Sequence, residues 1–395
     1  MIAQVTPVIL SAARTPTGRF DGSLSNIPAP RLGAYTIEAA VERAGVDPTL
    51  IDEVFMGQVV QAGSGQAPAR QAAIYANLPD SVGAVTINKI CGSGLFTVMM
   101  AATSIKAGEG RLFVTGGMEN MDMAPYMLSR ARYGYRLGSG EVLDATVHDG
   151  LTDPFHKHHM GISAEWIAEI YAITRAEMDA FALASHQKAA TAIDAGYFEE
   201  EIVPISVLQK RETIDFKSDE TVRRDATLEK LATLSPAFKQ GGLVTAGNAP
   251  PISDGASAVV VAHPDLADEL EIRPMARILG YAHHALEPLK LFTAPPYAVR
   301  KVLDKVGWSI EDVDLLELNE AFAAQAIHNI RDLGVDADKV NVNGGAIALG
   351  HAVGSSGSRV LTTLLYALRQ RDLRRGVAAL CLGGGEAVAM AIELI

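Results

Sequence analysis

The stretch "AYTIEAAVERAGVDPTLIDEV" (residues 34–54) occurs a second time in the chain, as "PYAVRKVLDKVGWSIEDVDLL" (residues 296–316). The two copies align without a gap, and Gly45 falls on Gly307. In each copy apolar residues recur three and four positions apart, a glycine follows, and a strand-like run comes after a short turn. Each copy therefore predicts an amphipathic helix followed by a β-strand.

Two further matches extend this repeat. "NKICGSG" (residues 88–94) aligns with "HAVGSSG" (residues 351–357), and "VTGGME" (residues 114–119) aligns with "CLGGGE" (residues 381–386). Because the matches keep their order and nearly keep their spacing, we interpret the chain as two homologous halves. Chance similarity between small-residue stretches is the alternative. Strand-like and helix-like runs alternate within each half, which favours an α/β fold with parallel or mixed sheets covered by helices.

The character of the sequence changes between the two halves. This part of the chain contains several histidines, a basic and aromatic run, and two helical stretches. We interpret it as an inserted loop or lid domain that covers the site. The predicted division is a first half over residues 1–122, the insertion over residues 123–251, the last strand of the first half over residues 252–272, and the second half over residues 273–395.

The composition is that of an ordinary globular enzyme, with 395 residues, 48% of them hydrophobic and 20% charged. The net charge of −12 argues against nucleic acid as the main partner, because phosphate backbones require concentrated positive charge. We find no apolar run of the roughly 18 residues that a membrane span needs, and no secretory signal pattern. The chain has only two cysteines, which favours reduced thiols, so we expect a cytoplasmic protein.

Cys91, the first of the two cysteines, lies where a strand-like run meets a helix-like run. A thiol at a helix N-terminus lies near unsatisfied N–H groups, and the helix dipole lowers its pKa. Gly92 and Gly94 let other backbone or a ligand approach closely. This pattern indicates a nucleophilic thiolate with an oxyanion hole of main-chain N–H groups. A small, buried, structural cysteine is the alternative.

The second half supplies further candidates. Cys381 ends an apolar strand, and three glycines follow at residues 383–385, so a tight turn with exposed N–H groups is expected. In isolation Cys381 would be a structural cysteine, but the repeat predicts that both thiols reach one pocket. His351, within glycine-rich sequence, supplies a base of near-neutral pKa. Asn319 and Glu320 follow a strand end, where active-site residues of α/β folds collect, although the asparagine could equally cap a helix.

The insertion carries two more motifs. His156, His158 and His159 form a cluster, but no Cys or Glu lies at ligand spacing, which disfavours a metal site. His159 alone could line the substrate pocket. The adjacent cations Arg223 and Arg224 suit a nucleotide-like ligand, and a solvated surface is an equal alternative.

Eight motifs, taken together and in this order, resemble signatures of the thiolase family and span nearly the whole chain. They are "SAARTPTGRFDGSL", "NKICGSG", "GGMENM", "HMGISAE", "VTAGNA", "ELNEAFAAQ", "NVNGGAIALGHAVGSSGSR" and "CLGGGEAVAM". The resemblance implies two βαβαβ halves in a five-layered α-β-α-β-α core with an inserted loop domain. It also implies an acyltransferase that condenses two acetyl-CoA to acetoacetyl-CoA and CoA, or thiolyses 3-ketoacyl-CoA.

The resemblance implies a role for each candidate residue. Cys91 would accept the acyl group from an acyl-CoA thioester, and His351 would deprotonate Cys91. Cys381 would remove the α-proton of the second acetyl-CoA in condensation, or protonate the leaving group in thiolysis. Asn319 would hold a water in one oxyanion hole, and the main-chain N–H groups of Cys91 and Gly383 would form the other. The implied substrate-binding and CoA-binding residues are Leu151, His159, Met160, Arg223, Ala246, Pro250, Ala321 and Phe322.

The family needs no metal or separate prosthetic group, because CoA carries the reacting thioester. Residues 130–136 resemble the loop that joins thiolase dimers into tetramers, so we expect a homodimer or a homotetramer. Two departures leave the CoA contacts and the acyl-chain preference open. Pro250 and Pro251 follow "TAGNA" where a serine is usual, and Phe292 and Ala294 stand where glycines are common beside the acyl pocket.

Four alternatives remain open. A degradative 3-ketoacyl-CoA thiolase of fatty-acid β-oxidation has the same chemistry with a longer acyl pocket. A decarboxylating ketoacyl synthase has the same two-half plan but pairs its cysteine with two histidines, whereas the second position here is Cys381. A non-catalytic lipid carrier or scaffold would be expected to lack a cysteine or the histidine. A redox switch between Cys91 and Cys381 predicts a reversible disulfide.

Overall fold

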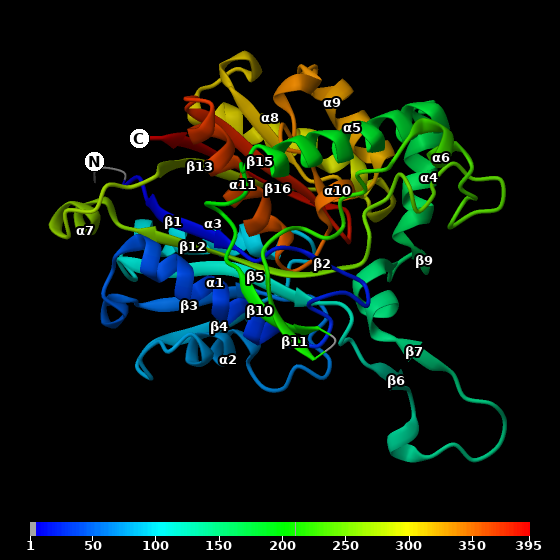
Figure 1. Cartoon of the computed structure of the whole chain (residues 1–395), viewed down its shortest axis with the longest axis horizontal. Helices are drawn as coiled ribbons and strands as arrows, with labels where there is room; N and C mark the ends of the chain where they lie inside the picture. The colour runs from blue at the N-terminus through cyan, green and yellow to red at the C-terminus, as the bar shows by residue number, and fades with distance from the viewer. Residues whose placement is uncertain (1–4, 210) are drawn as a thin grey trace.

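The computed structural model describes residues 5–209 and 211–395. Within this part of the chain, a mixed sheet of ten strands runs through the molecule (Figure 1). Its strands are β1 (Val8–Arg14), β2 (Gly18–Arg19), β3 (Glu53–Gly57), β4 (Gly83–Ile87), β5 (Leu112–Asn120), β12 (Ser253–Ala262), β13 (Ala276–Ala285), β14 (Leu315–Leu318), β15 (Arg375–Leu382) and β16 (Glu386–Leu394). The strand order is β4-β3-β5-β12-β1-β13-β16-β15-β14, and β2 pairs with β12.

This order is symmetric about the contact between β1 and β13, except that β4 extends the first half by one further strand. β3 and β5 are parallel neighbours, as are β14 and β15, and each pair is followed by an antiparallel strand, β12 or β16. The central strands β1 and β13 pair through Val8 with Arg277 and through Ile9 with Ala276. The internal repeat therefore folds into two equivalent halves, and the predicted duplication is confirmed.

Helices cover the sheet in layers. The helices of these layers are α1 (Ala29–Ala44), α2 (Pro68–Tyr75), α3 (Ser93–Ala107), α8 (Ala294–Val306) and α11 (Ser356–Gln370). Leu95 of α3 and Leu361 of α11 belong to one hydrophobic core that includes strands of both halves. The helices α1 and α2 pack in a separate core on the first half, and α8 packs in another on the second half. This arrangement is the expected α-β-α-β-α core.

The strands of the core are buried on both faces, and β12 shows the pattern. Val259 and Val261 contact the core of the central helices, whereas Val260 contacts the core of α1. Successive side chains of a strand point to opposite faces, so a strand covered on both sides is apolar throughout. All ten residues of β12 are buried.

Between the neighbouring strands β5 and β12, the chain makes a long excursion over residues 121–252. The arm formed by β6 and β7 extends away from the body of the molecule (Figure 1). Tyr126, Tyr133 and Leu137 are exposed on this arm. The excursion contains β6 (Tyr126–Leu128), β7 (Val142–Asp144), β8 (Thr152–Asp153), β9 (His158–His159), β10 (Ile205–Gln209), β11 (Glu212–Phe216), α4 (Met160–Ile170), α5 (Arg175–Asp194) and α6 (Leu228–Ala232). Outside it lie α7 (Pro264–Glu269), α9 (Ala323–Leu333) and α10 (Ala346–Leu349).

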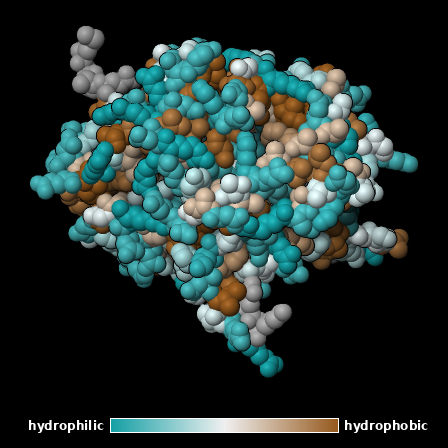
Figure 2. All heavy atoms as spheres, turned by 45° about the horizontal axis from the view of Figure 1, so that its top comes forward, coloured by the Kyte–Doolittle hydropathy of each residue, from teal (hydrophilic) through white to brown (hydrophobic). Residues whose placement is uncertain are grey.

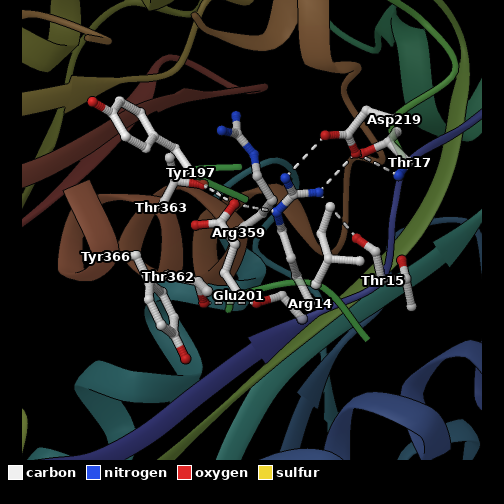
Figure 3. Close-up of polar contacts among 12 residues, drawn as sticks. Arg14, Thr15, Thr17, Tyr197, Glu201, Asp219, Arg359, Thr362, Thr363 and Tyr366 are labelled. Carbon is white, nitrogen blue, oxygen red and sulfur yellow. Dashed lines mark hydrogen bonds and ion pairs between the residues drawn. The ribbon is translucent and has the colours of Figure 1, made fainter. Parts of the chain in front are cut away.

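A buried ion cluster fastens the excursion to the sheet (Figure 3). Arg14 of β1 donates from Nε to Glu201 Oε1 at 2.5 Å and from its two Nη atoms to Asp219 at 2.7 and 2.9 Å. Thr363 of α11 also donates to Glu201 Oε1, at 3.2 Å, so the cluster joins both halves to the excursion. Burial alone lowers the pKa of Arg14, but the two carboxylates raise it above its usual value, so the guanidinium stays charged.

One stretch, residues 90–107, is long and apolar enough to cross a membrane, with a mean hydropathy of 1.3 over 18 residues. We expect no such run from the sequence, and this expectation is wrong. The stretch contains α3, which packs against α11 and against strands of both halves. Its hydropathy is therefore that of a central core helix.

The face in Figure 2 mixes hydrophilic residues with small hydrophobic patches.

The two central helices approach each other closely at their first turns. A Cβ atom on Gly94 would lie 2.6 Å from the Ser358 nitrogen, and a Cβ atom on Gly357 would lie 2.3 Å from the Leu95 nitrogen. Side-chain carbons do not come this close to backbone atoms, so the contact requires glycine at both positions. The "GSG" and "SSG" motifs of the repeat therefore set the packing of one half on the other.

We expect Gly357→Ala to destabilise the protein by about 2 to 3 kcal/mol, because the added methyl group overpacks the contact between α3 and α11. A glycine-to-alanine change in a helix normally stabilises by up to about 1 kcal/mol, so the sign is diagnostic. The measurement is the free energy of unfolding in urea. Gly83→Ala is the control, since its Cβ atom would meet its nearest neighbour at an ordinary 3.4 Å. An unchanged or raised stability of Gly357→Ala would contradict the packing argument.

Candidate active site

A cavity of about 540 Å³ lies where both halves meet the excursion. Most of the residues predicted for the site line it. The predicted residues in its wall are Cys91, Leu151, His159, Met160, Pro250, Ala321, Phe322, His351, Cys381 and Gly383. Asn319, Arg223 and Ala246 are not among the lining residues. Folding therefore brings together two sulfur atoms and one imidazole that are far apart in the sequence.

Cys91 lies in the connection between β4 and α3, two residues before the helix begins. Its pKa is raised to about 12, mainly because the site is shielded from water, with a further contribution from the charge of Glu119. Hydrogen bonds from the N–H groups of Cys91 and Gly383 to the sulfur lower the pKa. We expect a lowered thiol pKa from the sequence, and this expectation is wrong because desolvation outweighs the effect of the N–H groups.

His351 is held in one tautomer. Its Nδ1 lies 2.7 Å from the hydroxyl oxygen of Ser356, and that hydroxyl donates its only proton to the Ala352 carbonyl at 2.9 Å. The hydroxyl oxygen must therefore accept from Nδ1–H, which leaves Nε2 as the proton acceptor. Burial and then the charge of Arg359 lower the pKa of His351 to about 4, so the imidazole is neutral at pH 7.

Cys381 is the penultimate residue of β15 and is 1% exposed. Burial raises its pKa well above the usual value of a thiol, and the charge of Cys91 raises it further. The two thiols are therefore close enough to interact electrostatically. The glycine turn that follows is geometrically required, because Gly384 and Gly385 have φ angles of 86° and 93°.

Four rings in contact form one wall of the cavity. His159 stacks on Phe238 with a centroid distance of 4.6 Å, Phe238 contacts Phe322 edge-on at 6.1 Å, and Phe322 contacts Phe292 edge-on at 5.4 Å. His159 Nδ1 accepts from the N–H group of Gly161 at 3.0 Å, so the neutral ring presents Nε2–H as a donor. Burial is the main cause that lowers the pKa of His159.

The three predicted residues outside the wall have different surroundings. Asn319 is 2% exposed, and within the described part of the chain both atoms of its amide lack a hydrogen-bond partner. Ala246 and Arg223 are exposed, and the backbone N–H of Arg223 donates to Nδ1 of His186 at 3.1 Å. The guanidinium of Arg223 is therefore available to solvent.

The structure reveals two groups that we did not select from the sequence. Ser356 sets the tautomer of His351. The only sign of this role in the sequence is that Ser356 follows His351 by five residues, at the start of a helix. Glu119 is fully buried and accepts from the N–H groups of Val59, Val60 and Gly354 at 2.8, 3.2 and 3.0 Å. It thus joins the segment after β3 to the loop that carries the histidine. Burial raises the pKa of Glu119 to about 7.

The histidines of the insertion have partners of their own. His156 Nδ1 lies 2.5 Å from Asp153 Oδ2, and His158 Nε2 lies 2.8 Å from the Ser163 hydroxyl. In the parts of the chain that the structure describes, no group of three or more His, Cys, Asp or Glu side chains is placed to hold a metal ion.

The family model for the thiolase N-terminal domain matches residues 7–265, and the model for the thiolase C-terminal domain matches residues 272–394. The chain belongs to the thiolase family. An acetyl-CoA acetyltransferase of Cupriavidus necator is 51% identical over 387 residues, and one of Escherichia coli is 50% identical over 387 residues, each match covering 98% of both chains. The crystal structure of the acetyl-CoA acetyltransferase of Bacillus anthracis superposes with a TM-score of 0.98 at 43% identity and covers all of both chains.

The pKa values of this thiolase predict an unusual pH dependence of thiol reactivity. Because the pKa of Cys91 is about 12, its thiolate fraction should rise about tenfold per pH unit between pH 6 and pH 9. His351 stays neutral over this range and adds no inflection near pH 6.5. The measurement is the rate of Cys91 alkylation by iodoacetamide, followed by peptide mass spectrometry. A plateau below pH 8 would show instead a thiolate–imidazolium pair.

Proposed function

We propose that this thiolase is an acetyl-CoA C-acetyltransferase, which condenses two acetyl-CoA to acetoacetyl-CoA and CoA and also catalyses the reverse thiolysis. The observation that carries the proposal is that Cys91, His351 and Cys381 line one cavity in a chain about 50% identical to proteins of that name. Two thiols and one base are the groups that a two-step acyl transfer through a cysteine requires.

In the first step, the Cys91 sulfur attacks the carbonyl carbon of acetyl-CoA, and Nε2 of His351 takes the thiol proton. The thiol and the imidazole are both neutral at rest, so the proton moves as the C–S bond forms. The N–H groups of Cys91 and Gly383 lower the pKa of the Cys91 thiol, which supports their role as donors to the oxyanion. The thioester bond to CoA then breaks, and His351 returns the proton to the departing CoA sulfur.

In the second step, the Cys381 thiol passes its proton to Nε2 of His351, and the resulting thiolate removes a proton from the methyl carbon of a second acetyl-CoA. The enolate attacks the acetyl carbon on Cys91, and the sulfur of Cys91 leaves and takes the proton back from His351. We assign Asn319 to the second oxyanion hole, where its buried amide would hold a water.

For the substrate, we assign the acyl group to the apolar part of the cavity, against Met160, Leu151 and the ring wall. We assign Nε2–H of His159 as a donor to a thioester or keto oxygen, since Nδ1 accepts from the N–H group of Gly161. Ala246 and Pro250 would contact the pantetheine chain, and the exposed Arg223 would contact the adenine nucleotide of CoA. CoA carries the reacting thioester, so the proposed reaction requires no metal or prosthetic group.

Two surfaces support the proposal that the enzyme is a homodimer or a homotetramer. β4 lies at the edge of the sheet, with Val85 38% exposed, and an open strand edge readily pairs with another chain. The arm at residues 126–144 extends from the body with aromatic and basic side chains, as expected for a contact between dimers. A cytoplasmic location stays a prediction.

The alternative, a degradative thiolase that prefers longer 3-ketoacyl-CoA, is favoured by one observation. The cavity of about 540 Å³ has room for more than an acetyl group. We expect thiolysis to be fastest with acetoacetyl-CoA, because the ring wall that includes Phe292 closes the cavity on one side. The measurement is the kcat/KM for thiolysis of 3-ketoacyl-CoA of graded length, together with condensation of acetyl-CoA. A preference for long chains without condensation would establish the alternative.

Separate variants of the two cysteines test the mechanism. Cys91→Ser should abolish acetyl-enzyme formation from labelled acetyl-CoA, because the acceptor sulfur is lost. Cys381→Ser should still be acetylated but should form acetoacetyl-CoA at least about a hundredfold more slowly, because the base is lost. Intact-protein mass spectrometry and product assays measure the two steps. Acetylation that survives in Cys91→Ser would refute the assignment of the nucleophile.

A further inference from the structure

The loop that carries Cys91 and the glycine turn after Cys381 come from opposite halves and meet at the cavity. Ile90 packs against this turn, since a Cβ atom on Gly383 would lie 3.2 Å from its side chain. Gly92 packs against the end of β15, since a Cβ atom on Gly92 would lie 2.3 Å from the side chain of Leu382. The relative position of the two loops therefore fixes the positions of the N–H groups of Cys91 and Gly383.

An ion pair joins the same two loops. Nζ of Lys89, two residues before Cys91, contacts Oε2 of Glu386, which follows the glycine turn and begins β16. The two side chains are 23% and 36% exposed, so the pair is partly shielded from water. Lys89 is also fixed at its other contacts: its ammonium lies 5.3 Å from the ring centroid of Phe96, and its backbone N–H donates to Ser93 Oγ at 2.8 Å.

We propose that Lys89 and Glu386 form a latch between the two halves that positions the N–H groups of Cys91 and Gly383 around the reacting sulfur and carbonyl. Both are positioning residues, because they act through the two loops and not on the substrate. For the acetylation step the inference rests on the proposed function. For the position of the glycine turn against the loop of Cys91 it does not, because Ile90 packs on Gly383 in the protein alone.

The turn needs such a restraint for a physical reason. Three consecutive glycines have no side chains to hold them, and Gly384 and Gly385 lie in the left-handed region of φ. On one side the turn is held by the hydrogen bond from the Leu286 N–H to the Gly385 carbonyl at 2.7 Å. On the side of Cys91, the turn is held at the next residue along the chain, Glu386, by its charged contact with Lys89. A small displacement of an N–H donor strongly weakens the stabilisation that it gives to an oxyanion. A modest restraint on the turn therefore has a measurable effect on the rate.

Charge reversal tests the latch. Each of Lys89→Glu and Glu386→Lys should slow acetylation of Cys91 by acetyl-CoA about three- to tenfold, as expected for loss of a partly exposed ion pair. The double variant Lys89→Glu with Glu386→Lys restores the pair in reverse and should return to within about twofold of the wild type. Rapid quench followed by mass spectrometry measures the rate. Arg111→Met, which breaks the exposed pair with Glu269, is the matched control and should be unaffected.

The variant Glu386→Lys separates the latch from a simple charge effect. A second cation beside the site would by itself favour a thiolate and an oxyanion, so it would speed the reaction, whereas a broken latch slows it. Alkylation of Cys91 by iodoacetamide gives a second readout without CoA, and it should follow the same order of rates, because loosening the turn moves the Gly383 N–H group, which favours the thiolate, away from the sulfur. Melting temperatures close to that of the wild type establish that the variants are folded.

The possible outcomes are distinct. A double variant as slow as the slower single variant, or single variants as fast as the wild type in both assays, would overturn the latch. If the wild type is alkylated but not acetylated, the proposed function is wrong, and the alkylation rates alone decide the latch. A variant that does not fold is replaced by Lys89→Met and Glu386→Gln, each of which should slow alkylation, and unchanged rates in both would equally overturn the proposal.

Discussion

The contact between α3 and α11 is the constraint on which the rest of the structure depends. At Gly94 and Gly357 the two backbones approach to distances that exclude any side chain. Cys91 lies just before one helix and His351 just before the other, so this contact also sets the distance between the thiol and the imidazole. The same glycines thus serve the packing of the two halves and the assembly of the site.

Burial gives the site its chemical character. It raises the pKa of both thiols and lowers the pKa of the imidazole, so the three reacting groups are neutral at rest. In the proposed mechanism, charge therefore develops only during reaction, next to the N–H groups of Cys91 and Gly383. A thiol of such high pKa is rarely ionised, and the proposal offsets this because His351, held by Ser356, accepts the proton as the bond forms.

The excursion between β5 and β12 completes the site from outside the duplicated core. It supplies Leu151, His159 and Phe238 to the cavity, and the buried ions of Arg14, Glu201 and Asp219 hold it to the sheet. Buried ion pairs contribute little net stability, but breaking one leaves a charge without a partner and costs about 3 to 5 kcal/mol. The cluster therefore favours a single placement of the excursion over the site.

The sequence by itself determined the duplicated α/β plan, because the repeat preserves helical periodicity and glycine stops, which are local properties of the chain. It also indicated Cys91, Cys381 and His351, since glycine-rich strand ends are recognisable without coordinates. Only the tertiary structure decided the tautomer of the histidine, the buried carboxylate of Glu119 and the direction of the Cys91 pKa. Each of these depends on desolvation or on a partner from a distant segment. Helix position alone suggested a lowered thiol pKa, and the loss of water around the folded site reversed it.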